Sequence, residues 1–437
     1  MNYLYITMDY QQTIDYLFHR LPIFSRIGAA AYKKDLDNTL RLCEILDNPH
    51  KKFKTVHIAG TNGKGSTSHM LAAIFQTAGY KTGLYTSPHL KDFRERIKIN
   101  GNMISEQFVV DFTKKIQPHI DEIEPSFFEI TVAMAFDYFA TEQVDIAIVE
   151  VGLGGRLDST NVITPEVSVI TNIGMDHMNI LGDSLEKIAF EKAGIMKPHI
   201  PVVVGEILPE TKPVFEEVSA AQKTPMIIAP DKRRSIDWKY NHHLLTVEVS
   251  TLHTDEMNFY ELDLPGIYQT KNLVTVLEAV HQLQQKGWKI SHENILHALK
   301  NIKKLTGLFG RWQIIHQNPS VILDVGHNED GIKAIVSQLE VTTYHRLHIV
   351  FGMVKDKDIT TVLKLLPKHA TYYFTQAQIP RALDAESLKE ESAKFDLYGK
   401  SFPTVNEAAK DAISDAEKDD LILICGSVFI VGEVQLG

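Results

Sequence analysis

Glycine, lysine and hydroxyl residues between positions 60 and 66 have the types and order of a phosphate-binding loop. The loop reads Gly60-Thr61-Asn62-Gly63-Lys64-Gly65-Ser66 and follows a short apolar run, Val56 to Ala59. Ser66 to Ala78 then carries apolar residues at helical spacing, so the loop connects a strand to a helix. Backbone amides and a helix N-terminus hold phosphate in that setting. Lys64 would add a mobile positive charge, and Ser66 a hydroxyl near the metal–phosphate unit.

The spacing of this loop departs from the usual Walker pattern. Two residues, instead of four, separate the first glycine from Gly63-Lys64. A glycine-rich turn beside a solvated lysine is the alternative interpretation. The loop therefore favours phosphate binding, but by itself it does not identify a reaction.

Two other polar segments follow apolar runs with the pattern of buried strands. Glu150 is the second-last residue of the run Asp145 to Val151. Gly174-Met175-Asp176-His177 follows the run Val167 to Ile173. Because ligands bind parallel sheets at the carboxyl ends of the strands, we expect both segments and the loop at one sheet edge. Considered alone, Glu150 also fits a helix cap or an ion-pair partner, and His177 a general base or a core residue.

The elements that must position these residues alternate along the chain. Helices are predicted at Asp9–Leu21, Asp35–Leu46, Ser105–Ile123, Glu129–Ala140 and Ser184–Ile195. Strands are predicted at Lys81–Thr86, Asp145–Val151, Val167–Ile173 and Val202–Gly205. This alternation predicts an α/β fold with a mostly parallel sheet and helices on both faces.

The pattern changes after residue 231. Short antiparallel strands at His243–Val249 and Met257–Asp263 predict a small subsheet, and helices are expected at Thr270–Lys286 and His292–Lys303. The glycine-punctuated stretch Thr306–Trp312 is typical of a linker. Further strands are predicted at Val321–Val325, Leu347–Phe351, Thr371–Phe374 and Leu421–Cys425. We therefore expect a larger domain at residues 1–308 and a smaller, Rossmann-like α/β domain at residues 309–437.

Composition narrows the class of protein. The chain has 437 residues, 44% of them apolar and 23% charged, as in a soluble globular protein. Its net charge of -10 argues against a general nucleic-acid binder. Cys43 and Cys425 are the only cysteines, which argues against a disulfide framework or a thiolate zinc site. Without a long apolar run or a signal-peptide pattern, we expect a cytoplasmic protein that does not bind membranes.

Six motifs occur together and in order. They are the phosphate-binding loop, Thr86-Ser87-Pro88-His89-Leu90, the segment from Glu150 to Asp158 (Glu-Val-Gly-Leu-Gly-Gly-Arg-Leu-Asp), Glu191-Lys192-Ala193-Gly194-Ile195, Gly310-Arg311-Trp312 and Asp324-Val325-Gly326-His327-Asn328. The set resembles the folylpolyglutamate synthase/dihydrofolate synthase family, one of the Mur-type ATP-dependent amide ligases. The resemblance covers nearly the whole chain and implies a Mur-ligase-like fold. Gly65 favours the folate branch, because the Mur cell-wall ligases usually have threonine there.

The resemblance also implies ATP and two magnesium ions as cofactors. Ser87 and Glu150 would hold the first ion, and His177 and a carbamylated Lys192 the second. Carbamylation would turn the Lys192 cation into an anionic oxygen ligand, whereas two magnesium ions would repel an ammonium group. On its spacing alone, Lys192 reads as a solvated helical lysine. The residues with implied catalytic roles are Lys64, His177 and Lys192.

Further residues are assigned to ATP and glutamate by resemblance. Arg311 would contact ATP phosphate and Asp324 the ribose, so that the nucleotide lies between the domains. Taken singly, they also fit a linker cation and a strand-end cap. The full set implied for ATP is Thr61, Asn62, Gly63, Lys64, Gly65, Ser66, Asn272, Arg311 and Asp324. His327 and Ser427 are expected to face the incoming glutamate.

A pterin substrate is expected against the first domain. The positions that match the family pattern are Arg26, Ile27, Gly28, Ala29, Ser126, Phe127, Phe128, Glu129, Leu157, Asp158 and Ser159. A flat pterin needs apolar or aromatic walls, which Phe127 and Phe128 would provide. A pair of core phenylalanines at the start of a helix is the alternative. The Arg26 stretch departs most from the leucine-rich family consensus, which leaves the preference for dihydropteroate or folates open.

The sequence thus predicts an ATP- and magnesium-dependent ligase. It would add L-glutamate to dihydropteroate and to folate γ-carboxyl groups, as a monomer without nucleic-acid or membrane partners. The alternatives are a folylpolyglutamate synthase only, a Mur-type cell-wall amino acid ligase, and a non-catalytic nucleotide-binding switch. The combination of Ser87, Glu150 and His177 argues against the switch.

Overall fold

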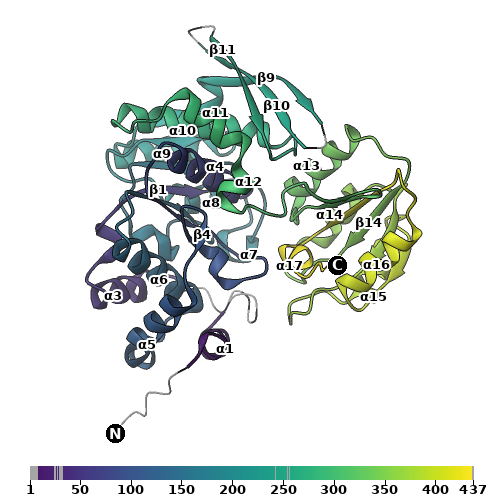
Figure 1. The fold of residues 1–437 in the computed structure, drawn as a ribbon, viewed down its shortest axis with the longest axis horizontal. Coiled ribbons are helices and arrows are strands. Elements are labelled where there is room, and N and C mark those ends of the chain that lie inside the picture. Colours follow the sequence, from purple (N-terminus) through teal and green to yellow (C-terminus); the bar gives the residue numbers. More distant parts are fainter. Residues whose placement is uncertain are drawn as a thin grey trace.

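The computed structural model describes residues 8–435, apart from residues 24, 25, 27, 29–32, 242, 253 and 255. Three sheets organise this part of the chain: an eight-stranded sheet, a three-stranded subsheet and a six-stranded sheet (Figure 1). The α/β architecture with a mostly parallel large sheet confirms the predicted fold class. Within the described ranges, no helix is long and apolar enough to cross a bilayer.

The eight-stranded sheet has the order β4-β3-β2-β5-β1-β6-β7-β8. Its strands are β1 (Lys54–Ala59), β2 (Thr82–Tyr85), β3 (Ile97–Ile99), β4 (Asn102–Met103), β5 (Ile146–Glu150), β6 (Val167–Ile170), β7 (Val202–Val204) and β8 (Met226–Ile228). β1 pairs in parallel with β5 and β6 at the centre, while β3 and β4 add an antiparallel edge. The sequence did not predict β3, β4 and β8, which are two or three residues long and show no periodic pattern. The equally short β7 was predicted because its three residues are all valine.

Helices cover both faces of this sheet. One face carries α4 (Lys64–Thr77), α10 (Gln269–Gln285), α11 (His292–Lys300) and α12 (Ile302–Thr306). The other carries α1 (Tyr10–Arg20), α3 (Asp37–Ile45), α5 (Glu106–Ile123), α6 (Phe127–Thr141), α7 (Met178–Leu181), α8 (Leu185–Ala193) and α9 (Lys212–Gln222). Strands between two such layers are apolar on both faces, which explains the continuous apolar runs.

Two helix predictions need correction. The helix expected from Glu129 begins at Phe127, because Ser126 caps it in a reciprocal pair of hydrogen bonds with Glu129. The helix expected at His292–Lys303 is divided at Asn301 into α11 and α12.

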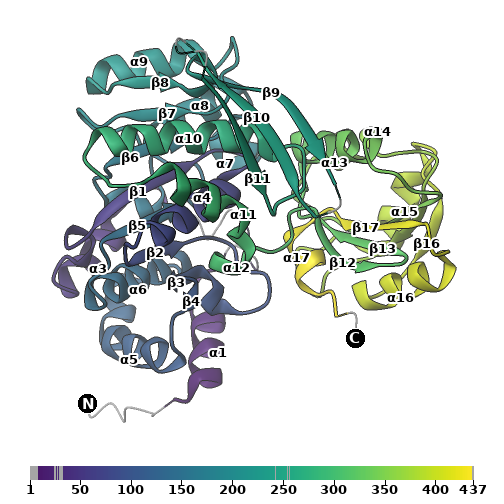
Figure 2. The same cartoon turned by 45° about the horizontal axis from the view of Figure 1, so that its top comes forward.

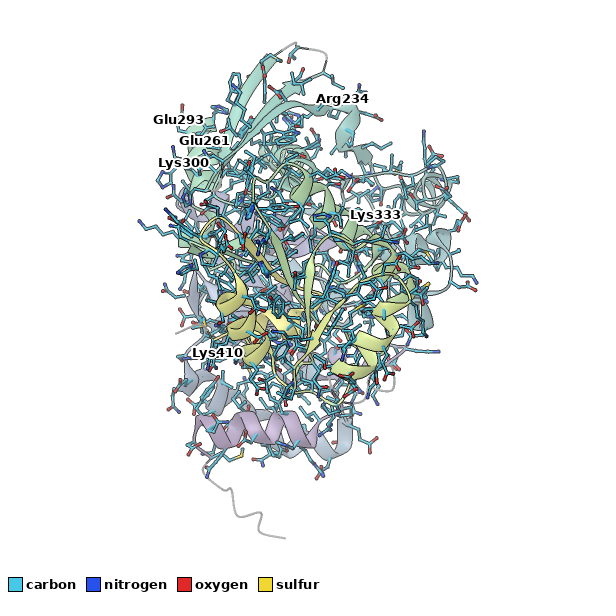
Figure 3. All side chains as sticks on the ribbon, turned by 90° about the vertical axis from the view of Figure 1, so that its right-hand side faces the viewer. Arg234, Glu261, Glu293, Lys300, Lys333 and Lys410 are labelled. Carbon is cyan, nitrogen blue, oxygen red and sulfur yellow. The ribbon has the colours of Figure 1, made fainter. Side chains whose placement is uncertain are left out.

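The antiparallel subsheet has the order β11-β10-β9 and lies over α10 and α11 (Figure 2). Its strands are β9 (Arg233–Tyr240), β10 (Leu245–Thr251) and β11 (Glu256–Leu262). The sequence missed β9, whose residues are mostly polar and exposed. An ion pair joins the subsheet to α11, where Nζ of Lys300 is 2.6 Å from Oε2 of Glu261 on β11 (Figure 3). At the end of β9, Nε1 of Trp312 donates to the hydroxyl of Tyr240 at 3.2 Å, which joins the subsheet to the rest of the chain.

The six-stranded sheet has the order β12-β13-β17-β14-β15-β16. Its strands are β12 (Gln313–Gln317), β13 (Ser320–Leu323), β14 (Leu347–Phe351), β15 (Thr371–Phe374), β16 (Gly399–Ser401) and β17 (Leu421–Cys425). Its helices are α13 (Glu329–Glu340), α14 (Ile359–Leu365), α15 (Ala385–Ala393), α16 (Val405–Asp415) and α17 (Val428–Gly432). Residues 307–312 connect α12 to β12, but the division of the chain at residue 308 stays a prediction.

Candidate active site

The glycine-rich loop lies between β1 and α4, where the sequence places it. Gly60 has a φ of 144° and Gly63, directly before the helix, a φ of 83°. A Cβ at Gly63 would lie 2.3 Å from Oδ1 of Asn272, so α10 leaves no room for a side chain there. On the same side, Nε2 of Gln269 donates to Oγ of Ser66 at 3.1 Å. The start of α10 is therefore packed directly on the loop, and the ATP contact of Asn272 stays a prediction.

Hydrogen bonds also fix the loop to the segment after β6. The hydroxyl of Thr61 donates to the carbonyl oxygen of Gly174 at 3.1 Å and accepts from the Gly174 amide at 3.0 Å. The amide of Asn62 donates to Oδ1 of Asn172 at 2.8 Å. The ends of β1 and β6 thus hold the loop in one conformation, which is the preorganisation that charge stabilisation in a reaction requires.

The half-buried Lys64 and the buried Lys192 meet at the carbonyl oxygen of Gly60. Nζ of Lys64 donates to it at 3.0 Å, and Nζ of Lys192 donates to it at 2.9 Å. Burial lowers the pKa of Lys64. Burial and, second, the charge of Lys64 lower the pKa of Lys192 to about 7. Because Lys192 is 4% exposed, its interpretation as a solvated helical lysine is wrong.

Glu150 ends β5 beside this loop and is 5% exposed. Its Oε2 accepts a hydrogen bond from the amide of Ser87 at 3.3 Å. A Cβ at Gly65 would lie 3.3 Å from Nη2 of Arg311 and 3.8 Å from Oε2 of Glu150, so Gly65 leaves a cradle between a guanidinium and a carboxylate. Burial raises the pKa of Glu150 to about 7, although Lys64 and Arg311 act in the opposite direction.

The glycine segment after Glu150 packs against the end of α8. A Cβ at Gly155 would lie 3.0 Å from the carbonyl oxygen of Lys192, so a side chain there would push the two segments apart. Asp158 holds the segment from inside, since its Oδ2 accepts from the amide of Leu153 at 2.8 Å. The buried carboxylate of Asp158 is therefore used for loop structure, and its pterin contact stays a prediction.

Asp176 and His177 receive side chains from the C-terminal part of the chain. Lys357 forms an ion pair with Asp176, and its Nζ lies 3.4 Å from Nε2 of His177. Nε2 of His327 is 3.4 Å from Oδ2 of Asp176, and Nδ2 of Asn328 donates to the same oxygen at 3.1 Å. Burial and then the charge of Lys357 lower the pKa of His177 to about 3. Burial acts to raise the pKa of Asp176, but the hydrogen bond from His327 and the charge of Lys357 outweigh it and hold the pKa well below its usual range.

Asn328 and Lys357 contact the site although the sequence predicted no role for either. Asn328 also exchanges hydrogen bonds of 3.2 Å with the side chain of Asn62, so it joins the phosphate-binding loop to α13. Asn328 is the last residue of the motif Asp324-Val325-Gly326-His327-Asn328, so its place in that motif could have indicated a role. Lys357 lies in Lys355-Asp356-Lys357-Asp358, which has the composition of a solvated turn and gave no signal.

Asp324 and Ser427 are buried, and their side chains accept hydrogen bonds from other residues of the chain. Asp324 accepts from the hydroxyl of Tyr268 at 2.7 Å and from the amide of Trp312 at 2.9 Å. Oγ of Ser427 caps α17 by accepting from the amide of Phe429 at 3.1 Å. The ribose and glutamate contacts implied for these two side chains stay predictions, as does the glutamate contact of His327.

The residues expected to bind pterin divide into two kinds. Phe127 is a core residue, with its ring centroid 4.9 Å from that of Phe18 and under the guanidinium of Arg96. Phe128 is half-buried and faces the glycine segment, since a Cβ at Gly152 would lie 2.4 Å from its Cζ. Of the two rings, that of Phe128 is therefore the one beside the glycine segment after Glu150.

The side chains of the other residues expected to bind pterin mostly contact the chain itself. Ser126 and Glu129 form the cap of α6, and Arg26 donates to backbone carbonyl oxygens at 3.0 Å. Gly28 has a φ of 61°, while Ile27 and Ala29 lie outside the described residues. Leu157 is half-buried and Ser159 buried, next to Asp158.

Two family models match the chain. Residues 58–280 match the model described as Mur ligase middle domain, and residues 310–428 match Mur ligase, glutamate ligase domain. The dihydrofolate synthase/folylpolyglutamate synthase of Bacillus subtilis (strain 168) is 34% identical over 423 residues, which are 92% of this chain and 94% of that protein. The folylpolyglutamate synthase of Lacticaseibacillus casei is 30% identical over 448 residues, 98% of each chain.

Solved structures of folylpolyglutamate synthases are also similar to this chain. The fold is similar to E. coli FolC in complex with DHPP and ADP, with a TM-score of 0.82, 31% identity and coverage of 97% of this chain and 96% of that one. It is also similar to the bifunctional folylpolyglutamate synthase/dihydrofolate synthase complexed with AMPPNP and Mn ion from Yersinia pestis c092. That match has a TM-score of 0.82, 30% identity and coverage of 98% and 97%.

Proposed function

Because the chain belongs to the Mur ligase family, we propose that it adds L-glutamate to dihydropteroate and to the γ-carboxyl of folates through an acyl-phosphate intermediate. The chain is an ATP-dependent carboxylate–amine ligase that joins glutamate to folates, the activity its relatives have in common. To this shared activity the proposal adds two specific acceptors, dihydropteroate and the folate γ-carboxyl, and the acyl-phosphate intermediate. One observation carries it: Glu150, Arg311 and the glycine cradle at Gly65 lie directly beside the phosphate-binding loop.

The first part of the proposed reaction brings two anions together. A carboxylate oxygen of the acceptor attacks the γ-phosphorus of ATP, ADP leaves, and the glutamate amine then displaces phosphate from the acyl phosphate. Positive charge must lie between the anions for the first attack. Lys64 is held at the loop by the carbonyl oxygens of Gly60 and Thr61, and the guanidinium of Arg311 lies against Gly65, so both cations act on the carboxylate of Glu150 at the cradle.

The residues of the cradle fit a divalent cation. Glu150 is a buried carboxylate whose Oε2 receives one long hydrogen bond from Ser87, and Gly65 leaves space beside it. Hard cations such as magnesium prefer such oxygen ligands. Glu150 and the hydroxyl of Ser87 would hold the first ion, which would neutralise charge on the phosphate oxygens. The manganese and AMPPNP bound by the Yersinia pestis relative support this assignment.

A second cation would meet a different environment. Beside His177 the chain places the ammonium groups of Lys357 and Lys192, and Lys64 lies next to Lys192, so these charges repel a divalent ion. His177 and Lys192 fit a second magnesium only if Lys192 carries a carbamate. The proposal therefore includes this carbamate, which the burial of Lys192 beside the loop supports.

A cytoplasmic location and a monomeric state are also part of the proposal. Cys43 and Cys425 are both free and buried, which fits a reducing compartment. Size-exclusion chromatography with light scattering would test the monomer.

Phosphate release tests the proposed function. ATP, magnesium and glutamate are supplied with dihydropteroate, tetrahydrofolate or a UDP-muramoyl acceptor. We expect glutamate-dependent phosphate release with the first two acceptors. Release with tetrahydrofolate only would reduce the activity to polyglutamylation. Release with the UDP-linked acceptor would favour a cell-wall ligase, and glutamate-independent turnover a nucleotide switch.

A further inference from the structure

One histidine interrupts the apolar strand that leads into the phosphate-binding loop. His57 lies in β1 between Val56 and Ile58 and is fully buried. Val56 and Ile58 pack in the core with α4, and because side chains alternate along a strand, His57 lies on the opposite face. Burial and, second, the charge of Lys197 lower the pKa of His57 to about 3, so the ring is neutral. A buried polar ring is unfavourable unless it is hydrogen-bonded, so the contacts of His57 indicate its role.

His57 begins a chain of hydrogen bonds that ends at Asp158. Nε2 of His57 lies 2.8 Å from the hydroxyl oxygen of Thr160, which belongs to the short helix Ser159–Val162. That hydroxyl donates to Oδ1 of Asp158. Because a hydroxyl has one hydrogen, Thr160 accepts from His57, and the ring proton is on Nε2. Nδ1 is buried and has no hydrogen-bond partner in the described part of the chain, so the ring acts through Nε2.

Asp158 connects this chain of hydrogen bonds to the glycine segment. Its Oδ2 accepts from the amide of Leu153 at 2.8 Å, and its Oδ1 accepts from the amide of Thr160 at 3.0 Å. Burial raises the pKa of Asp158, while the hydrogen bonds from Thr160 and Leu153 oppose this effect. The Thr160 hydroxyl therefore favours the ionised carboxylate, which is the stronger acceptor for the Leu153 amide. The hydrogen bond from His57 polarises this hydroxyl and strengthens it as a donor.

The glycine segment has little freedom to adjust if Asp158 releases it. Gly152 faces the ring of Phe128, and Gly155 lies against the end of α8. Nδ2 of Asn161 donates to the carbonyl oxygens of Arg156 and Gly194, both at 3.0 Å, and so fixes the far end of the segment to the residue after α8. The near end is held by Asp158 through the Leu153 amide. Loss of that hold would therefore move the backbone beside Phe128.

We propose that His57 and Thr160 are positioning residues for the acceptor. Through Asp158 they hold residues 152–155 where this backbone and the ring of Phe128 form the wall on which the pterin lies. The inference rests on the proposed function, because it takes the acceptor to be a pterin bound at Phe128. His57 stands on β1, which also leads into the loop at Gly60, so one strand holds the nucleotide loop and the acceptor wall in register.

Two substitutions of Thr160 test this role. Thr160→Val keeps the shape of the side chain but removes the hydroxyl, whereas Thr160→Ser retains the hydroxyl. We expect Thr160→Val to raise the KM for dihydropteroate by about tenfold, because one buried hydrogen bond is lost. The KM for ATP should stay unchanged, and Thr160→Ser should have the KM values of the unmodified chain. The same KM for dihydropteroate in Thr160→Val and Thr160→Ser would overturn the proposal.

Two substitutions of His57 test the contribution of Nε2. The amide nitrogen of glutamine reaches about as far from the backbone as Nε2, and that of asparagine only as far as Nδ1. We therefore expect His57→Gln to keep the KM for dihydropteroate near that of the unmodified chain, and His57→Asn to raise it as Thr160→Val does. Equal KM values in the two variants would remove His57 from the positioning role.

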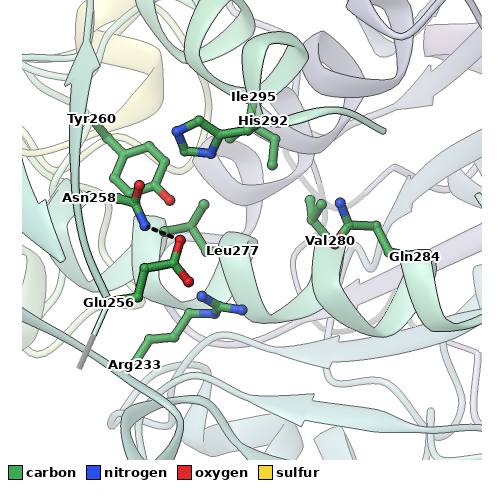
Figure 4. A pocket seen from close by; sticks show the side chains of 9 residues that line it. All are labelled: Arg233, Glu256, Asn258, Tyr260, Leu277, Val280, Gln284, His292 and Ile295. Carbon is green, nitrogen blue, oxygen red and sulfur yellow. Dashed lines mark hydrogen bonds between the residues drawn. The ribbon is translucent and has the colours of Figure 1, made fainter. Parts of the chain in front are cut away.

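A matched control lies in the groove between the subsheet and α10 (Figure 4). Arg233 lines this groove, its Nε is 3.4 Å from Oε2 of Glu278, and its Nη1 donates to the hydroxyl of Thr251 at 2.9 Å. Thr251→Val thus removes a hydroxyl that accepts from an ionisable side chain, but at a place that holds the subsheet. We expect a lower unfolding temperature and unchanged KM values. A raised KM for dihydropteroate in Thr251→Val would overturn the proposal, because lost stability alone would then explain the effect.

Hydrogen exchange without substrates separates this inference from the proposed function. Mass spectrometry should show faster exchange of residues 150–160 in Thr160→Val than in Thr160→Ser, because the Leu153 amide is held less firmly. Equal exchange in the two variants would overturn the inference alone. If the unmodified chain turned over neither dihydropteroate nor tetrahydrofolate, the proposed function would fail, and the acceptor role of His57 and Thr160 with it. Turnover of tetrahydrofolate only would move the same KM comparison to that acceptor.

Discussion

Nζ of Lys64 and Nζ of Lys192 share one hydrogen-bond acceptor, the carbonyl oxygen of Gly60, at 3.0 and 2.9 Å. Lys192 is buried and Lys64 half-buried, so water screens the repulsion between their charges less than it would at the surface. A carbamate on Lys192 would replace this repulsion by attraction. The same change would supply the anionic oxygen that a second cation beside His177 requires.

The first prediction concerns this pair. Lys192→Arg keeps a positive charge but cannot form a carbamate, so we expect loss of nearly all turnover. Lys192→Ala should be inactive too, and added bicarbonate or a small carboxylate should restore part of its activity by occupying the vacated position. Carbon-13 NMR with labelled bicarbonate would detect the carbamate directly. Near-normal turnover of Lys192→Arg would remove Lys192 from the metal site.

The second prediction concerns the phosphate-binding loop. Lys64→Ala should lower kcat by at least about a hundredfold, because it removes positive charge at the transferring phosphate. We expect its secondary structure to stay native, which circular dichroism would verify. The control is Lys333→Ala on the exposed side of α13, which should leave kcat unchanged (Figure 3). If Lys64→Ala kept most of its activity, the loop would have no part in the mechanism.

The third prediction concerns the cradle. Glu150→Gln replaces the carboxylate by a neutral amide, which is a weaker ligand for magnesium. We expect turnover to fall steeply, and to recover poorly when magnesium is raised. Titration with manganese, followed by electron paramagnetic resonance, should reveal one binding site fewer. An unchanged number of sites would speak against Glu150 as a ligand.

The fourth prediction concerns the ion pair between Lys357 and Asp176. Both side chains are about nine-tenths buried, so removal of one partner leaves an uncompensated charge. Lys357→Met should destabilise the packing of the C-terminal part on the loop by roughly 3–5 kcal/mol. Thermal unfolding measures the effect, with Lys355→Met, an exposed lysine of the same turn, as the control. Equal unfolding temperatures in the two variants would contradict the prediction.

The fifth prediction concerns acid stability of the six-stranded sheet. Burial of Asp420 acts to raise its pKa, but hydrogen bonds from the Glu417 amide and from His348 outweigh it, so the pKa is lowered. The stabilisation is therefore present above the unfolded pKa of about 3.9 and is lost as the pH falls through the lower folded value. Asp420→Asn should be less stable than the unmodified chain at pH 7, and this difference should shrink at pH 3.

Urea unfolding at the two pH values measures this difference. Asp419→Asn, which changes an exposed neighbour, is the control and should match the unmodified chain at both. If Asp420→Asn lowered the free energy of unfolding by the same amount at pH 3 and pH 7, a lowered pKa of Asp420 in the folded chain would be refuted.

The sequence predicts the fold wherever a strand or helix is long and apolar enough to show its period. β5 and β14 were found because both faces of each strand are buried. β3 and β4 are too short, and β9 is too polar, to produce a strand pattern. These strands form through packing against other parts of the fold, so their local sequence alone does not predict them.

The candidate site could be predicted where residues occur in motifs. Lys64, Glu150 and Lys192 lie together, as the motifs imply, although their roles remain proposals. Lys357 could not be found, because its function depends on a contact with Asp176 across 181 positions of sequence. Conversely, the spacing of Lys192 suggested a solvated residue, since a sequence does not reveal that the glycine segment after Glu150 covers this face of α8.

The most direct test of the proposed mechanism follows one oxygen atom. Dihydropteroate labelled with oxygen-18 in its carboxylate is incubated with ATP, magnesium and glutamate, and the released phosphate is analysed by mass spectrometry. Attack by the carboxylate on the γ-phosphorus transfers a labelled oxygen to phosphorus, so the account predicts one oxygen-18 atom in each phosphate released. Unlabelled phosphate, formed together with dihydrofolate, would contradict the acyl-phosphate intermediate.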